Sequence, residues 1–193
     1  VSEVVGTNGE QYDVTVSGGD LATHTGTVEL DLGDTPLISD RTGNLLAMTE
    51  PAIDQVYSLD HVDPFVVSFV RLLPNETPTN EDTLTFLVTF SESVLDVDAA
   101  DFVVNGTNLV DVAAINPISG SNNTQFEVIV SGSSLADFSG EIGLDLSVTQ
   151  NITDMAHNAL VAAEPCIDET FRIVPLQDLA FQASGSSVLT ASI

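Results

Sequence analysis

Short runs of alternating apolar and polar residues recur along this chain of 193 residues. In QFEVIVSG (125–132), Phe126, Val128 and Val130 lie on one face of an extended backbone and Glu127 lies on the other. A period of two, carried by β-branched and aromatic residues, predicts half-buried antiparallel strands. The same character is found in FVVSFVRLL (65–73), LTFLVTF (84–90), DFVVNGT (101–107) and GEIGLDLSV (140–148). No stretch keeps a helical period, so the chain is predicted to be all-β.

Turn signals separate these runs. Asn105-Gly106 and Ser131-Gly132 follow predicted strands, and Ser119-Gly120 precedes one. Nearer the N-terminus, Asn8-Gly9 lies between VSEVV and QYDVTV. Asn-Gly between two β runs is a strong signal for a hairpin.

The chain contains an internal repeat. ISDRTGNLLAMTEPAID (38–54) and ITDMAHNALVAAEPCID (152–168) share an Asp, an Asn four residues later, and Glu-Pro-x-Ile-Asp. A shift of 114 residues aligns 1–60 with 115–174 without a gap, and about a third of the aligned residues are identical. Agreement over this length indicates a duplication, and the period matches the length of one β-sandwich domain.

The two copies of the repeat are unequal in length. Residues 63–176 hold a complete second copy with about seven strands. Residues 1–62 hold only the C-terminal half of the first copy, because nothing in them matches 65–114. About three strands are missing from this copy. Its remaining strands would therefore expose a larger apolar face than soluble monomers usually do.

The incomplete copy has two explanations. The chain is a fragment of a longer protein, or a neighbouring molecule donates the missing strands. Residues 177–193 do not continue the repeat and are interpreted as a tail or as a possible donor strand. The residues expected on the uncovered face are Tyr12, Val14, Val16, Val28, Leu30 and Leu32.

Part of the repeat resembles a known family. FSESVLDVDAADFVV (90–104), followed in order by QFEVIVSG, GEIGLDL and ITDMAHNAL, is similar to the bacterial Ig-like repeats of large secreted surface proteins and adhesins. Those repeats combine a TFSE-type strand, a D-x-DF segment and a D-x-AGN-x-L loop near the end of the domain. The resemblance covers the second copy and the back half of the first. It departs at the loop, where the first copy keeps the glycine as Gly43 and the second copy has His157.

The resemblance implies an Ig-like antiparallel β-sandwich for each repeat and a location outside the cell or on its surface. It further implies a structural or adhesive module, namely a stalk or spacer. The expected partners are neighbouring Ig-like domains or other copies of the chain, joined by β-strand pairing. Two alternatives stay open: a filament subunit that polymerises by strand donation or domain swapping, and an ancillary ligand-binding module of a secreted enzyme.

The charge of the chain restricts its partners. It has 29 acidic and 3 basic residues, for a formal net charge of −26. Nucleic acids and anionic lipids are bound through Lys and Arg, so neither is expected as a partner. No apolar run approaches the roughly 18 residues needed to cross a bilayer, so no membrane insertion is expected. An acidic surface favours cations instead.

Calcium is the candidate cation for this acidic chain. Ca²⁺ takes about six to eight oxygen ligands from carboxylates, amides and carbonyls. Neither the EF-hand loop nor the nonapeptide calcium repeat is found in the sequence. The candidate ligands are Asp96, Asp98 and Asp101 in LDVDAADF, Asp60 and Asp63 in LDHVDP, and Asp54 and Asp168 with the neighbouring Glu50 and Glu164.

The repeated loop has a structural explanation that needs no metal. Asp40 and Asp154 suit a turn, because an Asp carboxylate accepts the backbone N–H two residues later. Asn44 and Asn158 suit the left-handed conformation that closes such a loop. His157 indicates that a positive φ is either not needed at its position or tolerated at some cost.

No catalytic pattern is found, and no enzyme activity is expected. HExxH, GxSxG and a glycine-rich phosphate loop are absent from the sequence. Among 29 carboxylates, the proximity of two acids carries little information about acid–base catalysis. The single cysteine, Cys166, matches Ala52 in the first copy and is predicted to be a small buried residue.

Overall fold

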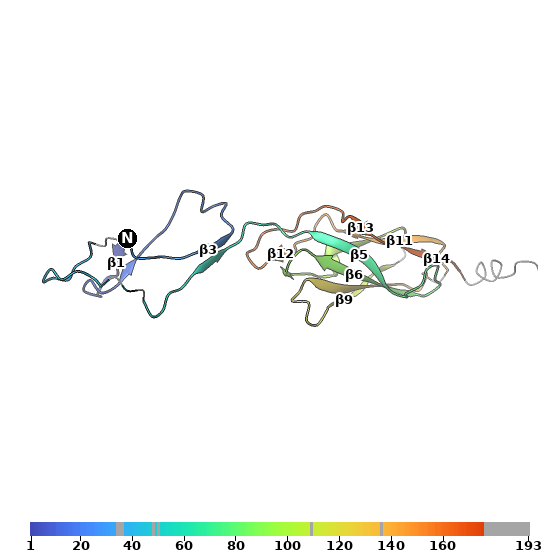
Figure 1. Cartoon of the computed structure of the whole chain (residues 1–193). Helices are drawn as coiled ribbons and strands as arrows, with labels where there is room; N and C mark the ends of the chain where they lie inside the picture. The colour runs from blue at the N-terminus through green and yellow to red at the C-terminus, as the bar shows by residue number, and fades with distance from the viewer. Residues whose placement is uncertain (34–36, 48, 50, 109, 136, 176–193) are drawn as a thin grey trace, which may run out of the picture. The chain divides into compact units, whose positions relative to one another are not determined.

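Strands make up nearly all the regular structure of this chain (Figure 1). The computed structural model describes residues 1–33, 37–47, 49, 51–108, 110–135 and 137–175. Within these residues the one helical segment is a 3₁₀ turn, η1 (Ala99–Asp101), which confirms the all-β prediction. The chain divides into two compact units: unit 1, Val1–Val62, and unit 2, Asp63–Ile193. Residues 177–193, interpreted as a tail or donor strand, lie outside the described residues.

The larger sheet of unit 2 has five strands in the order β13-β5-β6-β10-β9. Four of them pair antiparallel, whereas the short β13 pairs parallel to β5. The side chains of β10 alternate between half-buried and buried positions, and Phe126, Val128 and Val130 are the buried ones, as predicted. The strands are β5 (Val66–Leu73), β6 (Thr83–Phe90), β9 (Asp111–Pro117), β10 (Gln125–Ser131) and β13 (Ile167–Asp168).

A second sheet of unit 2 has three antiparallel strands in the order β14-β11-β8. They are β8 (Phe102–Asn105), β11 (Gly140–Leu146) and β14 (Phe171–Ile173). The first half of β11 pairs with β14 and its second half pairs with β8, so β11 holds this sheet together. A separate antiparallel pair is formed by β7 (Val94–Leu95) and β12 (Thr153–Asp154).

The two larger sheets of unit 2 share one hydrophobic core. Phe69 of β5 meets Phe102 of β8 with ring centres 6.4 Å apart, and Phe86 of β6 meets Phe171 of β14 at 5.0 Å. Both contacts are edge to face, an arrangement that stabilises by about 0.5–1.5 kcal/mol beyond the area that it buries. Each contact joins one sheet to the other. The apolar face of each sheet is therefore buried against its neighbour.

Unit 1 has four short strands in two antiparallel pairs. The turn between β1 and β2 contains Asn8 and Gly9 with φ of 55° and 80°, which confirms the predicted hairpin. A shift of 114 residues converts the β1–β2 register into that of β9 and β10, and the β3–β4 register into that of β11 and β14. The strands are β1 (Ser2–Glu3), β2 (Tyr12–Asp13), β3 (Gly26–Val28) and β4 (Tyr57–Leu59).

Unit 1 has no buried core among its described residues. All of its described residues are exposed or half-buried, whereas unit 2 contains many fully buried apolar side chains. Leu30 is 56% exposed, and the matching residue of the second copy, Leu144, is 0% exposed. The same sequence pattern is thus buried in one unit and solvent-exposed in the other.

Cys166 requires a correction to the sequence prediction, because it is exposed and not buried. The neighbouring Pro165 is the buried residue of this segment. Ala52, which matches Cys166 in the first copy, is also exposed. The two residues are both small, but small size is not a sign of burial in this segment.

Leu144→Ala is expected to lower the free energy of unfolding of unit 2 by about 2–5 kcal/mol, because it empties a fully buried site in a close-packed core. Leu30→Ala makes the same change at the matching residue and should leave the transition of unit 2 unchanged. Urea unfolding of the full chain, followed by circular dichroism, measures both variants. A comparable loss in Leu30→Ala would mean that Leu30 is packed in a core after all.

Candidate functional site

Asp98 and Asp101, two of the predicted calcium ligands, form a capping box at η1. Asp98 Oδ1 accepts the N–H of Ala100 at 2.7 Å, and Asp101 Oδ2 accepts the N–H of Asp98 at 2.6 Å. The other oxygen of Asp101 accepts the N–H of Asn151 at 3.1 Å. Burial raises the pKa of Asp101 despite these hydrogen bonds, and the charges of Asp98 and Asp96 act in the same direction. Both oxygens of Asp101 are therefore engaged by backbone donors.

The two repeated loops have the same hydrogen bonds. In each loop the Asp accepts the N–H groups two and four residues later at 2.8–2.9 Å, and its second oxygen accepts the Asn side-chain amide at 2.8 Å. This holds for Asp40 with Asn44 and for Asp154 with Asn158. The turn interaction expected from the sequence is present in both loops.

These hydrogen bonds favour the charged form of both carboxylates. The amide of Asn44 is the largest cause that holds the pKa of Asp40 well below its usual range. Burial of Asp154 acts in the opposite direction, but the hydrogen bonds from Asn158 and Ala156 outweigh it and lower the pKa of Asp154. A lowered pKa contributes stability above the ordinary pKa of Asp, near about 4, and this stability is lost as the pH falls through the lowered value.

The left-handed residue of each loop precedes the asparagine. Gly43 has a φ of 90° and His157 a φ of 67°, whereas Asn44 and Asn158 do not have positive φ angles, contrary to the sequence prediction. The asparagine side chains hold the Asp carboxylate, and the turn places its positive φ one residue earlier. His157 therefore accepts a conformation that disfavours non-glycine residues by about 1–2 kcal/mol.

Three carboxylates gather in unit 2. One carboxylate oxygen each of Asp145, Glu164 and Asp168 lies within 4.8 Å of the other two. Asp145 is in β11 and Asp168 is in β13, whereas Glu164 precedes β13. The sequence singles out Glu164 and Asp168 but not Asp145. All three residues are identical in the first copy of the repeat. The identity of Asp145 with Asp31, in the repeated Leu-Asp-Leu of both copies, is the sequence signal that could have identified it.

The electrostatics of this acidic cluster favour a bound proton or cation. Burial is the largest cause that raises the pKa of Glu164, followed by the charges of Asp145 and Asp168. Burial and the charge of Asp145 raise the pKa of Asp168 in the same way. The amide of Asn105 donates to Asp145 at 2.8 Å. Three carboxylates offer up to six oxygens, close to the roughly six to eight that Ca²⁺ takes, so this cluster could hold a hard cation.

The other predicted calcium ligands are not gathered in the described part of either unit. Asp96, Asp98 and Asp101 form no such group of oxygens among the described residues of unit 2. Asp54 and Asp63 are exposed, and Oδ1 of Asp60 accepts the N–H of Val62 at 3.0 Å. Within unit 2, Asp168 is thus the member of the predicted set that lies in a three-carboxylate cluster.

Unit 1 contains an apolar groove of about 430 Å³, called the unit 1 groove. Side chains of β2, β3 and β4, and of the segments that follow β2 and β3, line it. They include most of the residues expected on an uncovered face. Among them are Tyr12, Val14, Val28, Leu30 and Tyr57.

Comparison with protein-family models, with curated proteins and with solved structures found no match to this chain. Among the described residues, no helix is long and apolar enough to cross a membrane. The features that bear on function are therefore the acidic cluster, the unit 1 groove and the strand arrangement.

Glu164→Gln is expected to stabilise unit 2 at pH 7 by about 0.5 kcal/mol, because it removes one of three like charges near the surface. The pKa of Glu164 is raised in the folded state, so the wild-type protein should gain stability as the pH falls through that value, and the variant should gain less. Thermal unfolding at pH 7 and at about pH 4.5 measures this, with Glu81→Gln as a control outside the cluster.

Calcium provides a second test of the acidic cluster. Millimolar Ca²⁺ should raise the melting midpoint of unit 2 in the wild type, because binding to the folded state alone stabilises it, and should do so less in Glu164→Gln. Glu81→Gln should respond like the wild type. An identical midpoint in Ca²⁺ and in EDTA would exclude calcium as a ligand of this cluster.

Asn158→Ala is expected to lower the free energy of unfolding of unit 2 by about 1–2 kcal/mol at pH 7, because it removes a donor from the buried, charged Asp154. That donor helps to lower the pKa of Asp154, so the difference from the wild type should shrink as the pH falls toward about 3. Urea unfolding at both pH values measures it, with Asn116→Ala, at an exposed position of β9, as the control. A difference that grows toward low pH contradicts this role of Asn158.

Proposed function

We propose that the chain is a structural module of tandem Ig-like β-sandwich repeats that acts as a stalk or spacer in an extracellular or cell-surface protein. The 114-residue repeat of the sequence supports this proposal. The equal registers of β1–β2 with β9–β10, and of β3–β4 with β11–β14, support it as well. Strand register follows the side-chain pattern, so equal registers are expected for two copies of one fold.

The observation that carries the mechanical part of the proposal is the connection between β5, the first strand of unit 2, and the last two strands, β13 and β14. β13 pairs parallel to β5 through Ser68 and Phe69, and the N–H of Glu169 donates to the carbonyl of Phe69 at 2.9 Å. Farther along, Thr79 and Ile173 form a second parallel bridge. The last strands of the unit are therefore held alongside its first strand and the segment that follows it.

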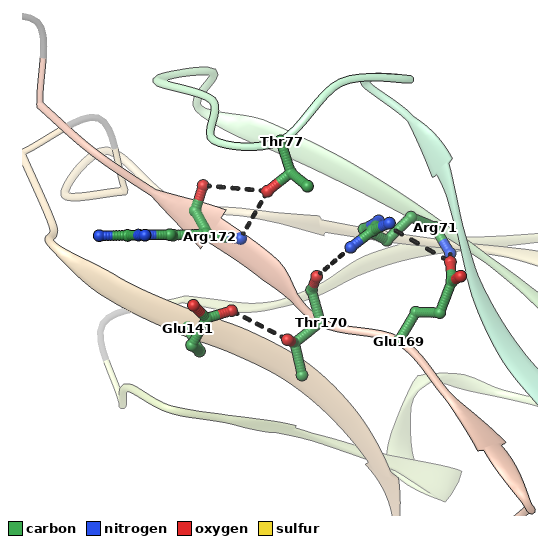
Figure 2. Close-up of polar contacts among 6 residues, drawn as sticks. All are labelled: Arg71, Thr77, Glu141, Glu169, Thr170 and Arg172. Atoms are coloured by element: carbon green, nitrogen blue, oxygen red, sulfur yellow. Dashed lines mark hydrogen bonds and ion pairs between the residues drawn. The ribbon is translucent and has the colours of Figure 1, made fainter. Parts of the chain in front are cut away.

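Polar contacts of Arg71 and Arg172 reinforce this connection (Figure 2). Nη1 of Arg71 donates to the carbonyl of Thr170 at 2.8 Å, and Nε of Arg71 lies 3.8 Å from Oε2 of Glu169. The same Glu169 oxygen accepts the N–H of Arg71 at 3.0 Å. Two residues after Thr170 in the chain, the N–H of Arg172 donates to Oγ1 of Thr77 at 3.0 Å.

The parallel pairing of the first strand, β5, with β13 near the C-terminal end of the unit suits a module that bears load along the chain. Force on the two ends pulls β5 and β13 in opposite directions along their length. The hydrogen bonds between them are then loaded together, whereas bonds at the end of an antiparallel hairpin are loaded one after another. Forced unfolding is governed by the unfolding barrier, so contacts that must break together slow it.

The acidic surface suits a module that stays extended in water. A net charge of −26 makes neighbouring repeats repel each other and keeps them hydrated. Repulsion of this kind is screened within about 10 Å at 0.1 M salt, so it acts between adjoining surfaces and not over the whole protein. It disfavours collapse of a tandem array into compact aggregates.

Single-molecule pulling on the ends of the full chain tests the proposal. Unit 2 is expected to unfold in one sharp step that releases roughly 35–40 nm, because each residue extends by at most about 3.6 Å. Arg71→Ala should lower the force of this step, since it removes the side-chain contacts of Arg71 with Thr170 and Glu169. Arg172→Ala is the matched control, because it removes the same charge while the contacts of Arg172 in Figure 2 are made by its backbone. Gradual extension without a step would contradict a load-bearing role.

A further inference from the structure

The apolar residues that line the unit 1 groove match buried core residues of unit 2. Under the 114-residue shift, Leu30 becomes Leu144 and Tyr57 becomes Phe171, and both of these are 0% exposed. The other apolar residues of the groove also match buried residues of the second copy. The unit 1 groove is therefore one side of a core.

The other side of that core is missing from unit 1. We call 63–114 the front half of the repeat and 115–174 its back half, which residues 1–60 match. In unit 2, Phe86 of the front half packs against Phe171 of the back half with ring centres 5.0 Å apart. Tyr57 matches Phe171 but is 74% exposed, and unit 1 has no front half to supply its partner.

We propose that the unit 1 groove is the docking site for one kind of segment, the front half of this same repeat, with the apolar pattern of β5, β6 and β8. The proposal rests on the repeat interpretation given under the proposed function and is independent of the mechanical role. In unit 2 the strand β9 runs from the front half into the back half, and β1 matches the end of β9 in register. The C-terminal end of the docked segment is therefore expected to meet β1, as residues 111–114 meet 115–117 within β9.

Donation of this segment by a second copy of the chain gives no net burial of apolar surface. Residues 1–193 contain two back halves and one front half, so a front half lent by unit 2 to a neighbour leaves the back half of that unit 2 uncovered. Phe69, Phe86 and Val88 of the front half are all 0% exposed in unit 2. Exchange between copies thus exposes as much apolar surface as it covers, and an additional front half is needed.

The unit 1 groove exposes two aromatic side chains and several aliphatic ones. Tyr12 is 55% exposed and Tyr57 is 74% exposed, and other apolar side chains of the groove are half-buried or exposed. A large aromatic side chain buries about 150–250 Å². The exposed parts of Tyr12 and Tyr57 in the groove are therefore apolar surface that a docked segment would bury.

The charges of unit 1 and of the front half predict how docking depends on salt concentration. Residues 1–62 contain 11 acidic and 1 basic residue, and residues 63–114 contain 9 acidic and 1 basic residue. Like charges oppose docking, and dissolved salt screens them. Docking should therefore strengthen as salt is added, which is the reverse of binding by opposite charges.

The experiment places an extra copy of residues 63–114 directly ahead of Val1 of the full chain, so that Ala114 precedes Val1 as it precedes Ile115 in unit 2. In this fused chain the amides of β2 and β3 are expected to exchange with deuterium on the order of 100-fold more slowly than in the unfused chain. A second cooperative thermal transition should appear, with a midpoint that rises with salt. Amides of unit 1 that exchange equally fast in both chains overturn the proposal.

Matched substitutions locate the docking site within unit 1. Val14→Asp in the fused chain places a charge in the groove and should abolish the added protection, because a buried unpaired charge is strongly destabilising. Val5→Asp adds the same charge at a residue that is 99% exposed and outside the groove, and should keep the protection. The protection of unit 2 amides shows in each variant that the rest of the protein is folded. Equal effects of the two substitutions overturn the proposal.

Light scattering of the unfused chain tests the second copy as the occupant, and a monomer is expected. A dimer that Val14→Asp dissociates and Val5→Asp preserves would identify a second copy in the groove and overturn the proposal. The force step of the pulling experiment reports on unit 2, and the exchange of β2 and β3 reports on unit 1. Either proposal can therefore fail without the other.

Discussion

An antiparallel sheet with one apolar face is stable only when a second layer covers that face, and the two units differ in this respect. In unit 2 the contacts of Phe69 with Phe102 and of Phe86 with Phe171 join two sheets. There, β10 has seven residues, whereas β2, which matches part of it, has two. Isolated strand pairs are marginally stable in water. The length of a strand in this protein therefore depends on its cover as well as on its sequence.

The features predicted from the sequence are those set by neighbouring residues. Alternation identifies the buried positions of β10, and Asn8-Gly9 identifies the first hairpin, because both signals lie within a few residues. The features that were missed depend on distant contacts. Asp145 joins Glu164 and Asp168 through the order of strands in the sheets, and Cys166 is exposed because Pro165 takes the buried place. A positive φ was wrongly expected at Asn158, whose side chain instead binds the carboxylate of Asp154, and the positive φ lies at His157, where the sequence left it open.

Acidic residues have two opposite environments in unit 2, although the sequence alone makes them look alike. Asp154 is surrounded by donors from its own loop, which lower its pKa and keep it charged. Glu164 and Asp168 meet other carboxylates, and burial with like charge raises their pKa values. The donors of its own loop favour the charged form of Asp154, whereas Asp145, Glu164 and Asp168 leave negative charge to be neutralised. A count of acidic residues does not distinguish these cases.

The pairing of β13 with β5 joins residues about a hundred positions apart, since Ile167 lies opposite Ser68. A fold closed by such distant pairing has a high contact order and is expected to form slowly. During synthesis on the ribosome, β5 and β6 emerge well before the strands that cover them. The aromatic residues of the nascent chain therefore stay exposed until the later strands are made. Repulsion between its many carboxylates is expected to oppose aggregation during that interval.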